Sequence, residues 1–146
     1  ENSKNNLIKE ATLFNVSKDR LIFAEYLPIK EHIKRHSQCD LFLDTFNFSA
    51  GATAVFAILS GTPVLTNYGN AFYSRMSASL LSSLDLEELI ADSTSNYREI
   101  AIELAKDQSK YKLIKKMLIN NLKSNKYLNS ELFTREFEMK LKNLLI

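Results

Sequence analysis

The 146-residue chain has little of what marks several large classes of protein. It has one cysteine, Cys39, which excludes both an internal disulfide and a zinc site built from four cysteines. No apolar run approaches the ~20 residues that span a bilayer, so no membrane span is expected. The net charge is only +2, which gives no electrostatic sign of nucleic-acid binding. With its single cysteine, the composition fits a cytoplasmic protein.

The start of the chain and its size give further expectations. The first residues, ENSKNN, lack the basic start and apolar core of a signal peptide. Because the chain begins with Glu1 rather than methionine, we expect it to have been cut from a longer protein. No internal repeat is present. With 45% apolar and 25% charged residues, the chain has the length and composition of one ordinary globular domain.

The spacing of apolar residues predicts an α/β fold. Short apolar runs alternate with amphipathic stretches, which favours a parallel sheet with right-handed crossovers. We expect strands at Leu21–Ala24, Leu41–Leu43 and Pro63–Thr66, and a short helix or turn at Asp85–Ile90. Helices are expected at 6–16, 28–38, 49–61, 70–84, 93–107, 108–124 and 129–146, with Gly61 closing the third. The predicted fold class is a partial Rossmann-like parallel sheet of about three strands, flanked by helices and followed by a helical C-terminal segment.

Small residues gather where the second predicted strand gives way to a helix. The sequence SAGAT supplies Ser49, Ala50, Gly51, Ala52 and Thr53. Unpaired N–H groups in a first helical turn form an anion site together with the helix dipole, and small residues let a phosphate approach the backbone. The Ser49 and Thr53 hydroxyls would add donors. The alternative is a small-residue helix packed tightly on the sheet, because neither a P-loop nor G-x-G-x-x-G is present.

A basic stretch follows the first predicted strand. In LPIKEHIKRH, His32 and Arg35 lie one helical turn apart and share a face, and Lys30 adds charge. These side chains either hold a nucleotide base by stacking and hydrogen bonding or form a solvated basic face, as charge runs usually do. His32 and His36 have the spacing of metal ligands. No carboxylate or cysteine has matching spacing on that face, so no metal is expected.

Nucleophilic catalysis has little support in the sequence. No G-x-S-x-G elbow is present. Cys39 stands at the entrance of an apolar strand and is predicted to be a buried structural thiol. Asp44 ends that strand, where it either has a functional role or caps the following loop. The basic run from Lys106 to Lys126 has ordinary amphipathic spacing, which indicates a packed helix with a solvated face rather than an RNA-binding surface.

Five segments occur in a characteristic order along the chain. They are the strand–Pro–His–Arg unit of DRLIFAEYLPIKEHIKRH, then DLFLDT, SAGAT, GTPVLT and SRMSASLL. Through them the chain resembles, from Asp19 to about Asp107, the donor-binding half of the O-linked N-acetylglucosamine transferase family. These are GT-B glycosyltransferases, with bacterial relatives that carry tetratricopeptide repeats. The resemblance implies the C-terminal lobe of a GT-B fold: a Rossmann-like UDP-sugar-binding part over residues 1–107, lacking its N-terminal strand, and helices 108–146 packed on it.

The resemblance also implies an activity. The full-length enzyme would transfer a sugar from a UDP-sugar, with UDP-GlcNAc as the expected donor, to protein side chains. The implied nucleotide-binding residues are Leu27, Lys30, His32, Arg35, Ser49, Gly51, Ala52 and Thr53. No catalytic residue is assigned, and the 146-residue piece alone is expected to be inactive. No metal or cofactor is implied, because the helix dipole and basic side chains neutralise the diphosphate. The expected partners are the UDP-sugar, a protein acceptor and the rest of the transferase chain, and no nucleic acid.

Three positions depart from the family pattern. Phe56 stands where members carry an acid that contacts the ribose, and phenylalanine cannot accept a hydrogen bond. Ile29 stands at a frequent lysine, and Gly51 at a frequent histidine. Two alternatives therefore stay open: a catalytically silent Rossmann-like interaction module derived from this family, and a nucleotide-binding domain of another α/β class. Isolated, the piece is expected to expose a sheet edge where the missing strands would pair, which favours dimerisation or aggregation.

Overall fold

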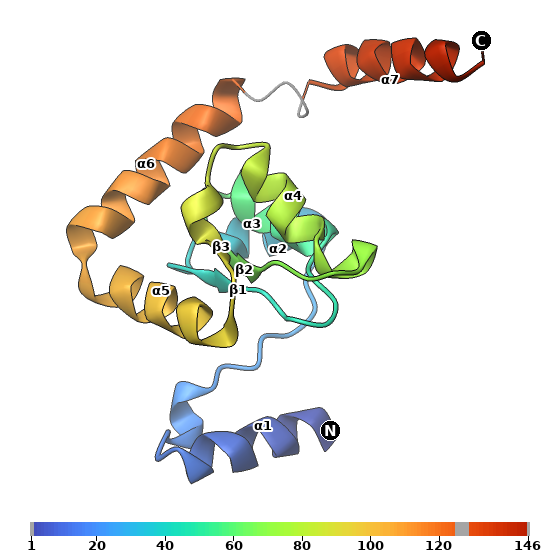
Figure 1. Cartoon of the computed structure of the whole chain (residues 1–146). Coiled ribbons are helices and arrows are strands. Elements are labelled where there is room, and N and C mark those ends of the chain that lie inside the picture. The colour runs from blue at the N-terminus through green and yellow to red at the C-terminus, as the bar shows by residue number, and fades with distance from the viewer. Residues whose placement is uncertain (1, 125–128, 146) are drawn as a thin grey trace. The chain divides into compact units, whose positions relative to one another are not determined.

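The computed structural model describes residues 2–124 and 129–145 of the chain (Figure 1). Contacts divide the chain into two compact units, Glu1–His32 and Ile33–Ile146. The boundary falls within helix α2 (Ile29–His36), so α2 begins in the first unit and ends in the second.

The first unit consists of a helix, a short 3-10 helix and an extended segment. Helix α1 (Asn2–Leu13) ends where Asn15 adopts a left-handed φ of +58° and the Val16 N–H donates back into the helix at 2.8 Å. The 3-10 helix η1 (Lys18–Arg20) follows. Every described side chain of α1 is at least partly exposed, and Lys4 Nζ lies 5.3 Å from the centroid of the Phe23 ring.

The predicted strand Leu21–Ala24 is wrong. Residues 21–28 have no regular secondary structure, although Leu21 has extended backbone angles of −96° and 104°. Ile22 is 91% exposed. A strand is stabilised by ladder hydrogen bonds to a neighbour, and none of the residues in the described ranges pairs with this segment. The apolar pattern gives extended backbone here without a ladder.

The second unit is built on three parallel strands. Strand β2 (Val64–Asn67) lies between β1 (Phe42–Leu43) and β3 (Ile90–Ala91). The strands predicted at Leu41–Leu43 and Pro63–Thr66 are confirmed to within one residue at each end. Figure 1 shows the three strands at the centre of this unit.

Strand β3 is absent from the sequence prediction. The segment Asp85–Ile90, expected to be a short helix or turn, contains the 3-10 helix η3 (Glu87–Leu89) and then enters β3. Thr66 of β2 is paired with Ile90 and Asn67 with Ala91. The prediction of a local turn is therefore confirmed in part, and the strand that follows it was missed.

Helices α3 (Ala52–Leu59), α4 (Met76–Ser82), α5 (Thr94–Lys106) and α6 (Gln108–Ser124) close one hydrophobic core around this sheet, and the 3-10 helix η2 (Phe72–Ser74) precedes α4. Helix α7 (Ser130–Leu144) has no buried residue and contributes none to that core. Helices α3, α4 and α5 contact β2, and α6 contacts α3 and α5. The buried core comprises Ala54, Ala57, Ile58, Val64, Leu81, Leu84, Leu86, Leu89, Leu104, Ile114 and Leu118. Each fully buried leucine or isoleucine contributes about 1.5–3 kcal/mol.

Helix α6 confirms the prediction of a packed helix with a solvated basic face. Ile114 and Leu118 are buried in the core, whereas Lys112 and Lys116 are exposed. On helix α7 the Phe133 and Phe137 rings stack with centroids 6.2 Å apart.

The end of α3 follows the predicted glycine closure. Gly61 has φ +78°, which is the left-handed conformation that glycine adopts without strain. Its N–H donates to the Ile58 carbonyl, and the Thr62 N–H donates to the Ala57 carbonyl, both at 2.9 Å. This pair of bonds is the Schellman motif, and it directs the chain straight into β2.

The expectation of a buried thiol at Cys39 is wrong, because this side chain is exposed. The Cys39 N–H donates to the His36 carbonyl at 2.9 Å, so the residue belongs to the turn that ends α2. The strand begins only at Phe42. Among the described helices, none combines the length and apolar character needed to cross a bilayer.

Candidate functional site

The carboxylate of Asp44 closes the connection between β1 and α3. Asp44 follows β1 directly and is 5% exposed. Its Oδ1 accepts the Thr45 N–H at 2.8 Å and the Ala50 N–H at 2.7 Å, and its Oδ2 accepts the Thr66 hydroxyl at 2.7 Å. Hydrogen bonds to an ionised group are about twice as strong as neutral ones. Asp44 therefore caps the loop, which is the second of the two roles predicted for it.

Tyr97, in the first turns of α5, binds the backbone of Asp44. Its hydroxyl donates to the Asp44 carbonyl at 2.9 Å, and its ring meets Phe46 edge-on with centroids 4.9 Å apart. Burial, and then the negative charge of Asp44, raise the pKa of Tyr97 to about 12. The phenol thus stays protonated near neutral pH and keeps donating its hydrogen bond.

The start of α3 is joined to the start of α4 by two buried serines. Ser49 is 1% exposed, its N–H donates to the Tyr73 carbonyl at 2.8 Å, and its hydroxyl oxygen accepts the Ser77 N–H at 3.3 Å. The Ser77 hydroxyl donates to the Ala50 carbonyl at 2.7 Å. The turn before α3 is therefore fixed by bonds from a segment more than 20 residues further along the chain.

Helix α3 begins without a side-chain cap. Its N-cap residue is Gly51, with φ −94° and ψ −96°, and the first intrahelical bond runs from the Val55 N–H to the Gly51 carbonyl at 3.2 Å. The N–H groups of Ala52 and Thr53 precede that bond, and both residues are exposed. The helix thus presents backbone donors and the positive end of its dipole beside the carboxyl end of β1.

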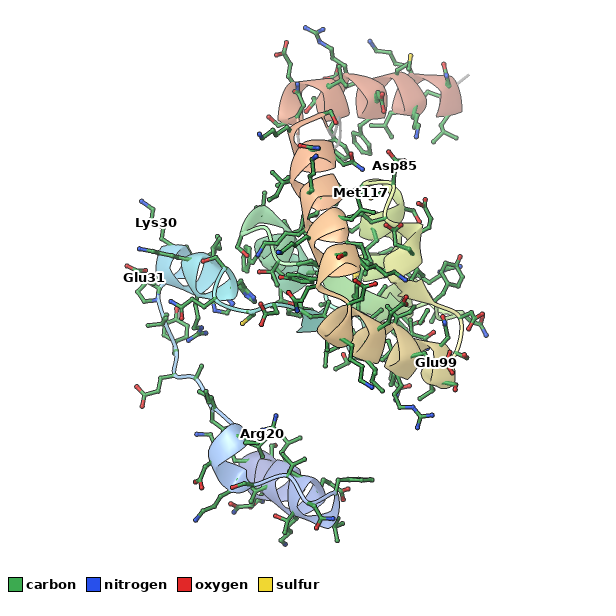
Figure 2. The ribbon with its side chains drawn as sticks, turned by 90° about the vertical axis from the view of Figure 1, so that its left-hand side faces the viewer. Arg20, Lys30, Glu31, Asp85, Glu99 and Met117 are labelled. Carbon is green, nitrogen blue, oxygen red and sulfur yellow. The ribbon has the colours of Figure 1, made fainter. Side chains whose placement is uncertain are left out.

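The structure brings four of the predicted nucleotide-binding residues into one turn. Ser49, Gly51, Ala52 and Thr53 lie at the start of α3, whereas Leu27, Lys30 and His32 belong to the first unit and Arg35 to the last turn of α2. His32 and Arg35 lie on one helix at the predicted spacing. Lys30 is exposed, and Figure 2 shows its side chain extending outward from the start of α2. Ser49 is buried, so its hydroxyl supports the turn from within.

Sequence reasoning missed three residues that shape this turn. Thr66, Ser77 and Tyr97 each bind the segment 44–50 from a distant part of the chain. A threonine inside the otherwise apolar stretch PVLT was the one available signal, because a buried hydroxyl needs a partner. Nothing in the local sequence of Ser77 or Tyr97 points to the segment they bind.

The strand ends also carry an unused acceptor and an exposed aromatic pair. Asn67 Oδ1, at the end of β2, is buried and has no hydrogen-bond partner within the described part of the chain. Phe48 and Tyr73 stack with centroids 5.8 Å apart, and they are 65% and 51% exposed. Over residues 2–124 and 129–145, no group of three His, Cys, Asp or Glu side chains has a metal-binding arrangement.

Comparisons with known proteins agree on one family. The sequence model of glycosyl transferase family 41 matches residues 1–137. A UDP-N-acetylglucosamine–peptide N-acetylglucosaminyltransferase of Giardia intestinalis is 35% identical over 104 residues, which are 70% of this chain and 7% of that protein. A probable enzyme of the same name, SPINDLY of Oryza sativa subsp. japonica, is 27% identical over 114 residues, 78% of this chain and 12% of that protein. The chain thus spans about a tenth of the curated relatives it matches.

A solved structure shows the same fold. A mutant of the Thermobaculum terrenum O-GlcNAc transferase superposes with a TM-score of 0.89 at 26% identity, covering 96% of this chain and 27% of that one. The predicted α/β fold class, with a three-stranded parallel sheet flanked by helices in a GT-B C-terminal lobe, is confirmed.

Proposed function

The chain belongs to glycosyl transferase family 41, and on that premise we propose that it forms the UDP-sugar-binding lobe of a protein glycosyltransferase. The donor is UDP-GlcNAc and the acceptor a protein side chain, because relatives are named for that reaction. The rest of a longer transferase chain supplies the other lobe. We further propose that the longer protein is cytoplasmic and bacterial and carries tetratricopeptide repeats. The proposal also includes a division into the lobe 1–107 and the helices 108–146.

The start of α3 is the single observation that carries this proposal. Ala52 and Thr53 are exposed, and their N–H groups precede the first intrahelical bond of α3 at the carboxyl end of β1, where parallel sheets of this kind bind ligands. Gly51 offers no side-chain oxygen to occupy those donors. The diphosphate of the donor fits here as an anion, and the same N–H groups stabilise the charge that develops on UDP as it leaves.

The nucleoside is assigned to residues of the segment 27–35. In this assignment Leu27 and Lys30 line the base, and His32 and Arg35 contact it from one face of α2, where a planar guanidinium can stack and donate. Lys30, His32 and Arg35 belong to helix α2, which has basic residues in its last turn, and Leu27 precedes that helix.

A charge placed at the start of α3 tests the anion site. Ala52→Glu adds an acid to the first residue of the helix, which stabilises the helix by about 0.3–1 kcal/mol yet repels a diphosphate. We expect UDP affinity, measured by calorimetry, to fall about tenfold or more relative to the neutral Ala52→Gln. Thr94→Glu is the matched control, since Thr94 is the exposed first residue of α5. Equal affinities for the three variants would contradict the proposal.

A second function is favoured by Phe56. This residue lies in α3 where the family pattern has an acid that contacts the ribose. The second function proposed on this ground is that of a catalytically silent interaction module. The longer protein that contains this chain would then show no transfer from UDP-GlcNAc. If the longer protein transferred sugar from UDP-GlcNAc and Arg35→Ala abolished that transfer, the silent module would be excluded. The outer edge of β1, which pairs with no other strand of the described residues and where Leu43 is 57% exposed, is the surface through which such a module would dimerise.

A further inference from the structure

A hollow beside the start of α3 has no role in the function proposed above. It has a volume of about 610 Å³ and is lined mainly by the loop after β2 and by the exposed face of α4. The residues that matter to the argument are Tyr68, Phe72, Arg75, Met76, Ser79 and Ser82. This volume lies within the range of about 300–1,000 Å³ that is typical of ligand sites.

The hollow adjoins the proposed diphosphate site. A Cβ built on Gly51 would lie 3.6 Å from the sulfur of Met76, which lines the hollow. The loop after β2 is also tied to the turn before α3, because the Ser49 N–H donates to the Tyr73 carbonyl at 2.8 Å. A molecule in the hollow therefore sits next to the position where the diphosphate of the donor is proposed to bind.

The loop that lines the hollow is held rigidly by its own backbone. The Gly69 N–H donates to the Ser74 carbonyl at 3.2 Å, and a Cβ on Gly69 would overlap the Ser74 side chain. Ser74 is 6% exposed, and its hydroxyl donates to the Ala71 carbonyl and accepts the Ala71 N–H. Because the loop is closed from within, Phe72 and Arg75 project outward from a fixed backbone, which lowers the entropy cost of binding.

The side chains of the hollow match those of protein-recognition surfaces. Phe72 is 77% exposed and Tyr68 58% exposed, far above the exposure that an aromatic ring has in a core. Tyrosine, phenylalanine, methionine and arginine are the residue types enriched at protein interfaces, and arginine and tyrosine are common hot spots. Exposed hydroxyls of Ser79 and Ser82 add donors and acceptors along the same wall.

Arg75 gives the hollow a charge preference. It is exposed, it is the one residue with a full charge among those lining the hollow, and no acid of the described ranges forms an ion pair with it. A guanidinium binds a carboxylate through two parallel hydrogen bonds.

We propose that this hollow receives the acceptor polypeptide, and that Arg75 selects segments with an acidic residue near the acceptor hydroxyl. The inference rests on the proposed function, because the position of the hollow beside the diphosphate gives it a role in transfer. Tyr68 and Phe72 contact apolar side chains of the segment regardless of its charge. Ser79 and Ser82 bind its backbone.

Peptide binding to the full chain tests the inference without requiring catalysis. Two fluorescein-labelled serine-containing peptides of equal length, one with glutamates and one with lysines, are titrated by fluorescence anisotropy. We expect the glutamate peptide to bind about three- to tenfold more tightly, with the preference reduced by salt. Arg75→Gln should remove the preference, Arg75→Glu should reverse it, and Phe72→Ala should weaken both peptides alike.

The controls separate this inference from the proposed function. Arg98→Gln removes an exposed arginine of α5 and should leave the preference intact. All variants should bind UDP as the unchanged chain does. Loss of UDP binding in Arg75→Gln would assign the arginine to the nucleotide and overturn the inference, as would an equal loss of preference in Arg98→Gln. A chain that binds the glutamate peptide but no UDP would overturn the proposed function while leaving the peptide site.

Discussion

Replacing Asp44 with alanine is expected to destabilise the chain by about 3–5 kcal/mol, although the side chain is small and lies in a loop. The substitution removes three hydrogen bonds of 2.7–2.8 Å. It also leaves the Ala50 N–H and the Thr66 hydroxyl without their acceptor, and each unsatisfied buried group costs about 1–3 kcal/mol. Since the free energy of unfolding of a domain is only about 5–15 kcal/mol, this single change removes a large part of it.

Milder variants divide the effect of Asp44 into its parts. Asp44→Asn keeps an oxygen for the two N–H groups but loses the charge, so we expect a loss of about 1–2 kcal/mol. Thr66→Val removes one bond without changing volume and should cost about 1–2 kcal/mol. Asp40→Ala is the matched control. Asp40 is an exposed aspartate just before β1, where a surface change stays within about 0.5 kcal/mol.

Urea unfolding followed by circular dichroism measures these differences, provided that the slope against denaturant is the same in each variant. A double-mutant cycle over Asp44→Asn and Thr66→Val should give a coupling free energy of about 0.5–3 kcal/mol, because the two side chains are in contact. If Asp44→Ala destabilised the chain no more than Asp40→Ala, the carboxylate would not hold the loop and the account of the site given above would fail.

Two further predictions concern Tyr97 and the loop after β2. The raised pKa of Tyr97 means that its stabilising contribution is complete below pH 10 and is lost as the pH rises towards 12; Tm should therefore fall over that range, and fall less in Tyr97→Phe. Gly69→Ala should unfold the loop and lower Tm sharply, because the added Cβ would overlap Ser74. Gly51→Ala is the control and should change Tm little, because the added Cβ would lie 3.6 Å from Met76. Equal shifts in Tm would refute the close approach at Gly69.

The elements that the sequence predicts well are those whose local pattern agrees with their surroundings. Residues 41–43 and 63–65 are continuous apolar runs bounded by polar or turn residues, and the last two residues of each run fall in the neighbouring strands β1 and β2. Helix α3 is closed by Gly61, which adopts the left-handed conformation that favours glycine. At these positions local preference and tertiary packing point to the same structure.

Two segments could not be predicted from their own composition, because pairing decides whether a segment becomes a strand. The segment Leu21–Ala24 has the apolar composition of a strand and lacks a ladder, whereas Ile90–Ala91 follows an acidic turn and becomes β3 by pairing with Thr66 and Asn67. Two residues carry no periodicity, so no pattern within the segment could have revealed that strand.

The candidate site likewise has one part that the sequence predicts and one part that it does not. The small residues at the start of α3 are visible in the sequence and identify a place where an anion can approach the backbone. The orientation of that turn depends on contacts with Thr66, Ser77 and Tyr97, which lie 22, 28 and 53 residues from their partners. The local sequence does not reveal the partner in contacts of that range. Ser49 illustrates the result: its hydroxyl was expected to add a donor to the anion site and instead supports the turn from inside.

Buried small polar side chains explain why these loops carry so many serines and threonines. Asp44, Ser49, Thr66, Ser74 and Ser77 are each at most 6% exposed, and each has a hydrogen-bond partner in a loop at the strand ends. A buried polar group stabilises a fold only when it is satisfied, so each of them fixes one backbone conformation. The outward side chains of the same loops, Arg75 and Phe72 among them, contribute nothing to this framework. Substitutions there are accordingly expected to change what the lobe binds and to leave its folding intact.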